Sequence, residues 1–189
     1  MKFTCFSFFA VLLTCVPLTA HSNAIGDADR DLFQYIHEDM KNRFLDVTLP
    51  VVGRMGDGRV YLGVSTLLCA FGNEKMAETG KLAVVAFIEA GAVTGSLQQI
   101  TGRPRPLNKT DKTSFPSGHA TFAFTMATVA GYEYPILRIP LYVAAFGTAL
   151  SRIYLGKHYP GDVIAGAVVG TLAGMSAIHF KKPILRFSF

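Results

Sequence analysis

The chain has 189 residues, of which 50% are hydrophobic and 16% are charged, with a net charge of +5. The charged share is below the ~25% typical of soluble domains, and the basic excess favours anionic partners such as phosphate groups or acidic lipids. Three cysteines and no glycine-rich nucleotide-binding loop argue against a disulfide scaffold, a cysteine metal cluster and a P-loop enzyme.

Residues 1–24 have the pattern of a secretion signal. Lys2 supplies the basic start, an apolar stretch comes next, and "SNA" at 22–24 forms a small-x-small cleavage site. A retained first membrane helix is the alternative interpretation. Both interpretations place the chain after residue 24 outside the cytoplasm, and we expect residues 25–189 to form a single domain.

The rest of the chain alternates between polar and apolar segments. Residues 25–48 carry apolar side chains at helical spacing, which predicts an amphipathic helix on a membrane surface or on other helices. A glycine-rich turn comes next at 51–59. Five apolar runs then occupy 60–72, 82–100, 120–132, 139–150 and 163–180.

These runs predict an all-α, multi-pass membrane bundle of about five to six helices, with its helical core over residues 49–180. Only the second and last runs approach the ~20 residues that span a bilayer. The others continue into Thr, Ser, Tyr or Arg residues that suit a membrane interface. We therefore interpret all five as membrane helices with polar ends.

The charged residues between the apolar runs indicate which ends of the helices face the cytoplasm. A Lys-Lys pair and an arginine lie in the tail 181–189, which the positive-inside tendency places in the cytoplasm. The same topology places the segments 101–118 and 151–162 outside. The first of these is basic, and a basic outer loop breaks the tendency, which suggests a functional role.

Three polar clusters lie at the helix ends expected on that outer, extracytoplasmic side. Their candidate site residues are Gln98, Arg103 and Arg105; Ser117, Gly118 and His119; and Arg152, Lys157, His158 and Asp162. Arginine side chains suit phosphate oxygens. The carboxylate, His or Cys sets of a catalytic metal site are missing. The combination favours metal-free phosphoryl transfer with a histidine nucleophile.

The segment 151–162 offers the candidate nucleophile. Pro160 can occupy the first position of the last helix, which puts Asp162 in the first turn. From there the carboxylate can accept a hydrogen bond from one nitrogen of His158 and leave the other nitrogen free as a base or nucleophile. For this cluster alone, a capping Asp beside an ordinary loop His is the alternative.

The segment 115–120 offers an anion site at a helix start. Ser117 can cap a helix that begins near His119, and Gly118 lets a ligand approach the backbone closely. Free N–H groups at a helix start attract anions, and a histidine there can give a proton to a leaving oxygen. A capped helix start with an incidental histidine is the alternative.

Taken together, these motifs resemble the type 2 phosphatidic acid phosphatase superfamily, which includes bacterial acid phosphatases and vanadium haloperoxidases. The family pattern is K-x6-R-P, then P-S-G-H, then S-R-x5-H-x3-D. The second and third motifs are complete here, and Arg105-Pro106 matches the end of the first. Gln98 stands where the family has its lysine and brings no charge. The resemblance covers about residues 44–180.

The resemblance implies a role for each matching residue. His158 attacks phosphorus and forms a phosphohistidine, Asp162 orients His158, and His119 protonates the leaving oxygen and then activates water. The implied phosphate contacts are Arg105, Arg152, Ser117 and the Gly118 amide, with Gln98 as a further contact and Arg103 as one substitute for the missing lysine charge.

The resemblance further implies a hydrolase of the cell (inner) membrane that uses no metal or cofactor and faces the periplasm or exterior. Its expected partners are membrane lipids and a lipid phosphate substrate of the phosphatidate, phosphatidylglycerophosphate, undecaprenyl diphosphate or lipid A class, with no nucleic acid. The alternatives are a soluble periplasmic acid phosphatase, a non-catalytic phospholipid-binding or assembly protein, and a haloperoxidase. Gly166, Gly170 and Gly174 argue against the soluble form, since four-residue glycine spacing suits close helix packing in membranes.

Overall fold

The computed structural model of the chain describes residues 23–186, and this part is helical without any strand. The targeting or membrane segment expected over 1–24 therefore lies outside the described residues except for its last two, as do the last three residues of the expected tail. The elements are α2 (Asn23–Gln34), a π-helical turn η2 (Tyr35–Asp39), α3 (Arg43–Met55), α4 (Gly58–Phe71), α5 (Glu74–Thr101), α6 (Gly118–Glu133), a 3₁₀ turn η3 (Pro135–Leu137), α7 (Arg138–Tyr154), α8 (Pro160–His179) and α9 (Lys181–Arg186).

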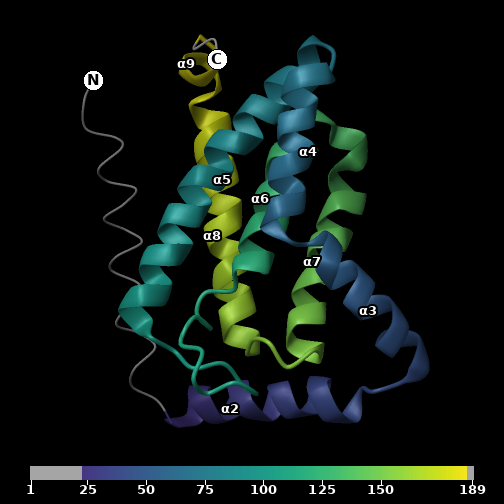
Figure 1. Cartoon of the computed structure of the whole chain (residues 1–189), viewed down its shortest axis with the longest axis vertical. Coiled ribbons are helices and arrows are strands. Elements are labelled where there is room, and N and C mark those ends of the chain that lie inside the picture. The colour runs from purple at the N-terminus through teal and green to yellow at the C-terminus, as the bar shows by residue number, and fades with distance from the viewer. Residues whose placement is uncertain (1–22, 187–189) are drawn as a thin grey trace.

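Helices α4 to α8 run lengthwise beside one another, with α2 across one end of the bundle and α9 at the other (Figure 1). Each of the five predicted apolar runs lies in one of them, although the first and last runs extend one residue beyond their helices. Three described segments are long and apolar enough to cross a membrane, judged by length and composition: Glu74–Thr101, Pro135–Tyr154 and Pro160–His179. The sequence prediction of an all-helical membrane fold is confirmed at this level.

The prediction of a single amphipathic helix over 25–48 is wrong: the described structure has separate helical elements on the two sides of Asn42. The helical conformation ends at Asp39, and three residues later Asn42 has an extended backbone (φ −155°, ψ 157°). The Asn42 side chain accepts a hydrogen bond from the Leu45 amide at 3.0 Å and so caps a new helix, α3. This local cap interrupts the apolar periodicity, and α3 continues to Met55 through much of the expected glycine-rich turn.

Helix α6 lies at the centre of the bundle and packs most closely on α8. A Cβ added at Gly166 or Gly170 would approach the backbone oxygen of Ser117 or Thr121 to within 2.5 Å. One added at Gly174 would meet the Thr128 side chain at 2.7 Å. The close packing expected from the glycine spacing is therefore confirmed, and it fixes the start of α6 against the start of α8.

Candidate active site

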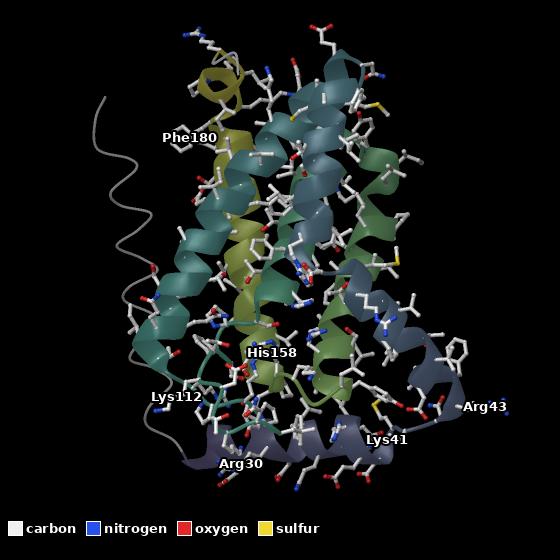
Figure 2. All side chains as sticks on the ribbon, viewed as in Figure 1. Arg30, Lys41, Arg43, Lys112, His158 and Phe180 are labelled. Carbon is white, nitrogen blue, oxygen red and sulfur yellow. The ribbon has the colours of Figure 1, made fainter. Side chains whose placement is uncertain are left out.

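The three predicted polar clusters meet at the end of the bundle that α2 crosses. Gly102 has a positive φ of 52° and ends α5, and the next loop runs along this end before α6 begins. Gly156, with φ 68°, lies in the short turn between α7 and α8. Figure 2 shows His158 at this end and Phe180 at the opposite one.

His158 lies in the turn before α8, and its side chain is only 2% exposed. Its Nδ1 lies 2.8 Å from the Ser114 carbonyl oxygen. A carbonyl oxygen can only accept, so Nδ1 carries the proton and Nε2 keeps a free lone pair. Burial, together with the charge of the nearby Arg105 guanidinium, lowers the pKa of His158 to about 3. His158 is therefore neutral at neutral pH, as a nucleophile must be.

Asp162 does not accept the hydrogen bond predicted from His158, because its Oδ2 lies 3.9 Å from Nδ1. The reason is local: Pro160 begins α8 as expected, but His158 lies outside the helix, and the carboxylate turns back to the amide of Tyr159 at 2.9 Å. The same Oδ2 accepts from Ser114 Oγ at 2.5 Å. Asp162 thus reaches His158 through Ser114, which holds both groups.

Arg103, a predicted substrate contact, is held by two carboxylates instead. Its Nη1 lies 2.6 Å from Asp162 Oδ1 and its Nη2 lies 2.5 Å from Asp29 Oδ2. The guanidinium also stacks 4.4 Å above the Tyr159 ring centroid. The Arg103 side chain is 32% exposed. Because both of its terminal nitrogens bind aspartates, Arg103 is an ion-pair partner of Asp29 and Asp162 rather than a free phosphate ligand.

Arg105, Arg152 and Ser117 each have a buried polar atom that makes no hydrogen bond in the described structure. Within residues 23–186, the buried side-chain nitrogen and oxygen atoms that lack a hydrogen bond are Arg105 Nε, Arg152 Nε and Ser117 Oγ. Arg105 Nε does lie 2.9 Å from Asp111 Oδ2, but without hydrogen-bond geometry. Buried donors left without an acceptor are costly. An anion bound at this position would satisfy them.

The motif that leads into α6 differs in detail from the prediction. Ser117 is the residue before α6, but its hydroxyl makes no capping hydrogen bond; its amide donates to the Asp162 backbone oxygen at 2.9 Å. The helix begins at Gly118, and His119 is half-buried in the first turn. Gln98 donates from its side-chain amide to the Pro116 carbonyl at 3.1 Å, so at least one of its two N–H groups anchors this segment.

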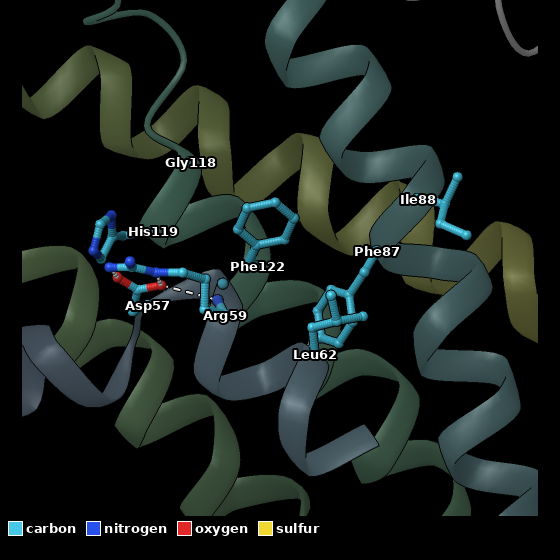
Figure 3. Close-up of a pocket in the computed structure, with 9 residues that line it drawn as sticks. Asp57, Arg59, Leu62, Phe87, Ile88, Gly118, His119 and Phe122 are labelled. Atoms are coloured by element: carbon cyan, nitrogen blue, oxygen red, sulfur yellow. Dashed lines mark hydrogen bonds and ion pairs between the residues drawn. The ribbon is translucent and has the colours of Figure 1, made fainter. Parts of the chain in front are cut away.

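His119 also lines a cavity of about 390 Å³ between α4, α5 and α6. Figure 3 shows His119 beside Asp57 and Arg59 at one end of this cavity. Hydrogen bonds from Arg59 lower the pKa of Asp57, so its carboxylate stays ionised beside the imidazole. The remainder of the cavity is lined by the apolar side chains of Leu62, Phe87, Ile88 and Phe122.

Sequence reasoning missed three residues that support this site: Asp29, Ser114 and Tyr159. Ser114 lies just before the PSGH motif and carried no signal of its own. Asp29 is 74 positions from Arg103 in the sequence, and no local pattern links two residues so far apart. Lys157, which the sequence placed in the third cluster, is exposed.

Comparison with known proteins begins with a family model. The model of the PAP2 superfamily matches residues 79–185. Among curated proteins, the lipid A 1-phosphatase of Porphyromonas gingivalis is 42% identical over 91 residues, which is 43% of this chain and 20% of that protein. The undecaprenyl-diphosphatase of Sulfolobus acidocaldarius is 26% identical over 188 residues, covering 92% of this chain and 88% of that protein. The chain spans between 20% and 53% of the first curated relatives that it matches.

Two solved structures have the same fold. The first transmembrane PAP2-type phosphatidylglycerolphosphate phosphatase from Bacillus subtilis aligns with a TM-score of 0.75 at 26% identity, over 97% of this chain and 96% of its own. Aquifex aeolicus LpxE aligns with a TM-score of 0.68 at 30% identity, over 79% of this chain and 93% of its own. With more than half of its length matched by the family model, the chain belongs to the PAP2 superfamily.

Proposed function

We propose that this chain is a metal-independent membrane phosphatase that hydrolyses a lipid phosphate or diphosphate through a phosphohistidine at His158. One observation carries the proposal: Arg105 and Arg152 act on a neutral histidine, and each has a buried Nε that makes no hydrogen bond, as does the buried hydroxyl of Ser117. Two guanidinium groups and a hydroxyl match the oxygens of a phosphoryl group, and they favour the charge that develops on those oxygens in the transition state.

The first step forms a bond between His158 Nε2 and phosphorus while the bond from phosphorus to the leaving oxygen breaks. His119 donates a proton to that leaving oxygen. In the second step His119 takes a proton from water, the water oxygen bonds to phosphorus, and the bond from phosphorus to Nε2 breaks. The Ser114 carbonyl holds the Nδ1–H of His158 throughout, so that Nε2 faces the phosphoryl group.

The apolar cavity beside His119 supports a substrate with a hydrocarbon chain. Its lining of Leu62, Phe87, Ile88 and Phe122 adjoins the proposed proton donor directly, so a lipid tail can lie there while the phosphate reaches the arginines. The relatives named as lipid A 1-phosphatase and undecaprenyl-diphosphatase support this substrate class. The proposed substrate partners are thus lipids of these and the phosphatidate and phosphatidylglycerophosphate classes.

The proposed location is the cell (inner) membrane, with the site on the periplasmic or exterior side. The basic residues of α9, at Lys181, Lys182 and Arg186, lie at the end of the bundle opposite His158 (Figures 1 and 2). The positive-inside tendency favours the cytoplasm for that end. Cysteine labelling at Lys112 and at Lys182 with a membrane-impermeant thiol reagent, in a background in which Cys5, Cys15 and Cys69 are replaced, tests this orientation. We expect labelling at position 112 only; the reverse pattern would contradict it.

Phosphate release by the purified full chain tests the activity. Wild type and His158→Ala are compared on a panel of lipid phosphates in detergent, with thermal melting as the control for folding. We expect release by wild type that exceeds His158→Ala by at least about a thousandfold, as for removal of a nucleophile. Equal release by two folded proteins would refute the histidine nucleophile and favour a phosphate-binding protein without catalysis.

A further inference from the structure

Helix α2 lies across the ends of α7 and α8, next to the proposed site (Figure 1). Its inner face is attached at several points. Phe33 packs on Tyr159 with ring centroids 5.4 Å apart. In the turn after α2, the His37 Nδ1 lies 2.7 Å from the Tyr154 carbonyl. The N-terminal helix is therefore built against the turn that carries His158.

Asp29 is the charged group on this inner face, and its side chain is 11% exposed. Its Oδ1 accepts a hydrogen bond from the Gly161 amide at 2.7 Å, at the start of α8. Its Oδ2 accepts from Arg103 Nη2 at 2.5 Å. A carboxylate at a helix N-terminus is favoured by the helix dipole as well as by these two donors.

The contacts of Asp29 continue without a break to the proposed nucleophile. Arg103 uses its other terminal nitrogen for Asp162, and Asp162 accepts from the hydroxyl of Ser114. The Ser114 carbonyl then accepts from Nδ1 of His158. Each link in this path is 2.5 to 2.8 Å long. The path joins α2 to the atom that sets the tautomer of the nucleophile.

Arg103 is the decisive link, because one guanidinium is shared by two carboxylates. Held on both sides, it balances the charge of Asp162, whose side chain is fully buried. Without the charge of Asp29, one side of the guanidinium fork has only a weak partner. The guanidinium of Arg103 is then held less firmly, and the charge on Asp162 loses its fixed counterion.

We infer that Asp29 on α2 is a positioning residue for phosphotransfer, acting through Arg103, Asp162 and Ser114 to hold His158 as the Nδ1–H tautomer. The expected effect on kcat rests on the proposed function. The expected effect on the tautomer of His158 rests on the hydrogen-bond geometry alone. A positioning role for Asp29 makes the N-terminal helix part of the active site, although this helix precedes the residues 79–185 matched by the family model.

Kinetics of the full chain in detergent give the first test, with phosphatidate as the probe and the other lipid phosphates of the panel if it is not cleaved. Asp29→Asn keeps the shape of the side chain and removes its charge. We expect kcat to fall about tenfold, the effect of weakening one charged hydrogen bond, with KM unchanged. Asp29→Glu should recover part of the loss. Asp31→Asn, an exposed aspartate on the same helix, is the matched control and should behave as wild type.

Coupling through Arg103 is tested by a double-mutant cycle. Arg103→Lys keeps the charge but cannot bridge two carboxylates with a fixed fork. If Asp29 acts through this guanidinium, adding Asp29→Asn to Arg103→Lys should lower kcat by clearly less than it does alone. Additive losses would overturn the path through Arg103.

The tautomer of His158 provides a readout that needs no turnover. Histidine is labelled with ¹⁵N, and the His158 signals are assigned by their loss in His158→Ala. Wild type should show the Nδ1–H tautomer, and Asp29→Asn a mixture of the two neutral tautomers. An unchanged tautomer in Asp29→Asn would overturn the inference, whatever the effect on kcat. If wild type cleaves no lipid of the panel, the proposed function fails, and the tautomer shift alone then decides the role of Asp29.

Discussion

Gly166 on α8 lies where this helix touches the segment that leads into His119, and replacing it tests how closely the two halves of the site must be placed. A Cβ at this position would lie 2.5 Å from the Ser117 carbonyl oxygen, whereas ordinary contact begins at 3.4 Å. Gly166→Ala must therefore widen this contact by 0.5 to 0.9 Å, which is 3.0 or 3.4 minus 2.5, and we expect Ser117 to move away from α8. Because Ser117 directly precedes Gly118 and His119, the start of α6 moves with it.

The movement separates His119 from His158, which hold opposite sides of the proposed phosphoryl group. A misplacement of about 1 Å can cost about a hundredfold in rate, so we expect kcat to fall between about tenfold and a hundredfold. Overpacking should also lower the free energy of unfolding by ~1–3 kcal/mol. The two effects need separate controls.

Two other glycines supply those controls. Gly174→Ala overpacks the same helix pair, with a Cβ 2.7 Å from the Thr128 side chain, but lies about 12 Å further along α8 from the site. It should lower the melting temperature and leave kcat unchanged. Gly95→Ala adds a Cβ that meets nothing within 4 Å, so both the melting temperature and kcat should stay close to those of wild type.

The assay is kcat on a lipid phosphate well below the melting temperature, with melting curves in the same detergent. A wild-type kcat for Gly166→Ala would refute the reasoning, because the start of α6 would then tolerate the displacement. A loss of kcat in Gly174→Ala equal to that in Gly166→Ala would also refute it, since a general loosening of the bundle would explain both.

Three further predictions concern single residues around the site. Gln98→Leu removes a neutral hydrogen bond to Pro116 and should lower kcat about fivefold with KM unchanged; a raised KM in steady-state kinetics would show instead that Gln98 contacts phosphate. Arg152→Lys keeps the charge but loses the guanidinium fork, so inhibition by orthovanadate should weaken about tenfold, and an unchanged inhibition constant would remove Arg152 from the phosphate site. The pKa of His158 falls from 6.5 in the unfolded chain to about 3 in the folded one. Between pH 6.5 and pH 3 the imidazole therefore binds a proton in the unfolded chain only, so the free energy of unfolding must decrease as the pH is lowered. The melting temperature should therefore drop less between pH 7 and pH 4 in His158→Phe than in wild type; an equal drop would contradict the buried neutral imidazole.

The helices of the bundle could be predicted from the sequence because their signals are local. The apolar runs predicted α4 to α8, and Pro160 predicted where α8 begins. The four-residue spacing of Gly166 and Gly170 predicted close helix packing, which the structure places between α8 and α6. The break at Asn42 was missed because a single capping side chain outweighed a periodic apolar pattern that continued on both sides of it.

The sequence predicted that the three polar clusters lie at one end of the bundle, but not the hydrogen bonds that connect their residues. The i, i+4 spacing of His158 and Asp162 suggests a direct pair, but that geometry holds only within a helix, and His158 lies before α8 begins. Arg103 resembled a phosphate ligand by its type and position. One of its two carboxylate partners, Asp29, comes from a helix distant in sequence, and this pairing depends on how α2 packs against the bundle.

The central claim, a phosphohistidine at His158, is tested most directly by trapping the intermediate. The full chain is mixed rapidly with a ³²P-labelled lipid phosphate and quenched in alkali, which preserves phosphohistidine, and the labelled peptide is identified by mass spectrometry. The account predicts label on the peptide that contains His158, and no label in His158→Ala. Label on another residue, or turnover without any labelled protein at times shorter than one catalytic cycle, would contradict it.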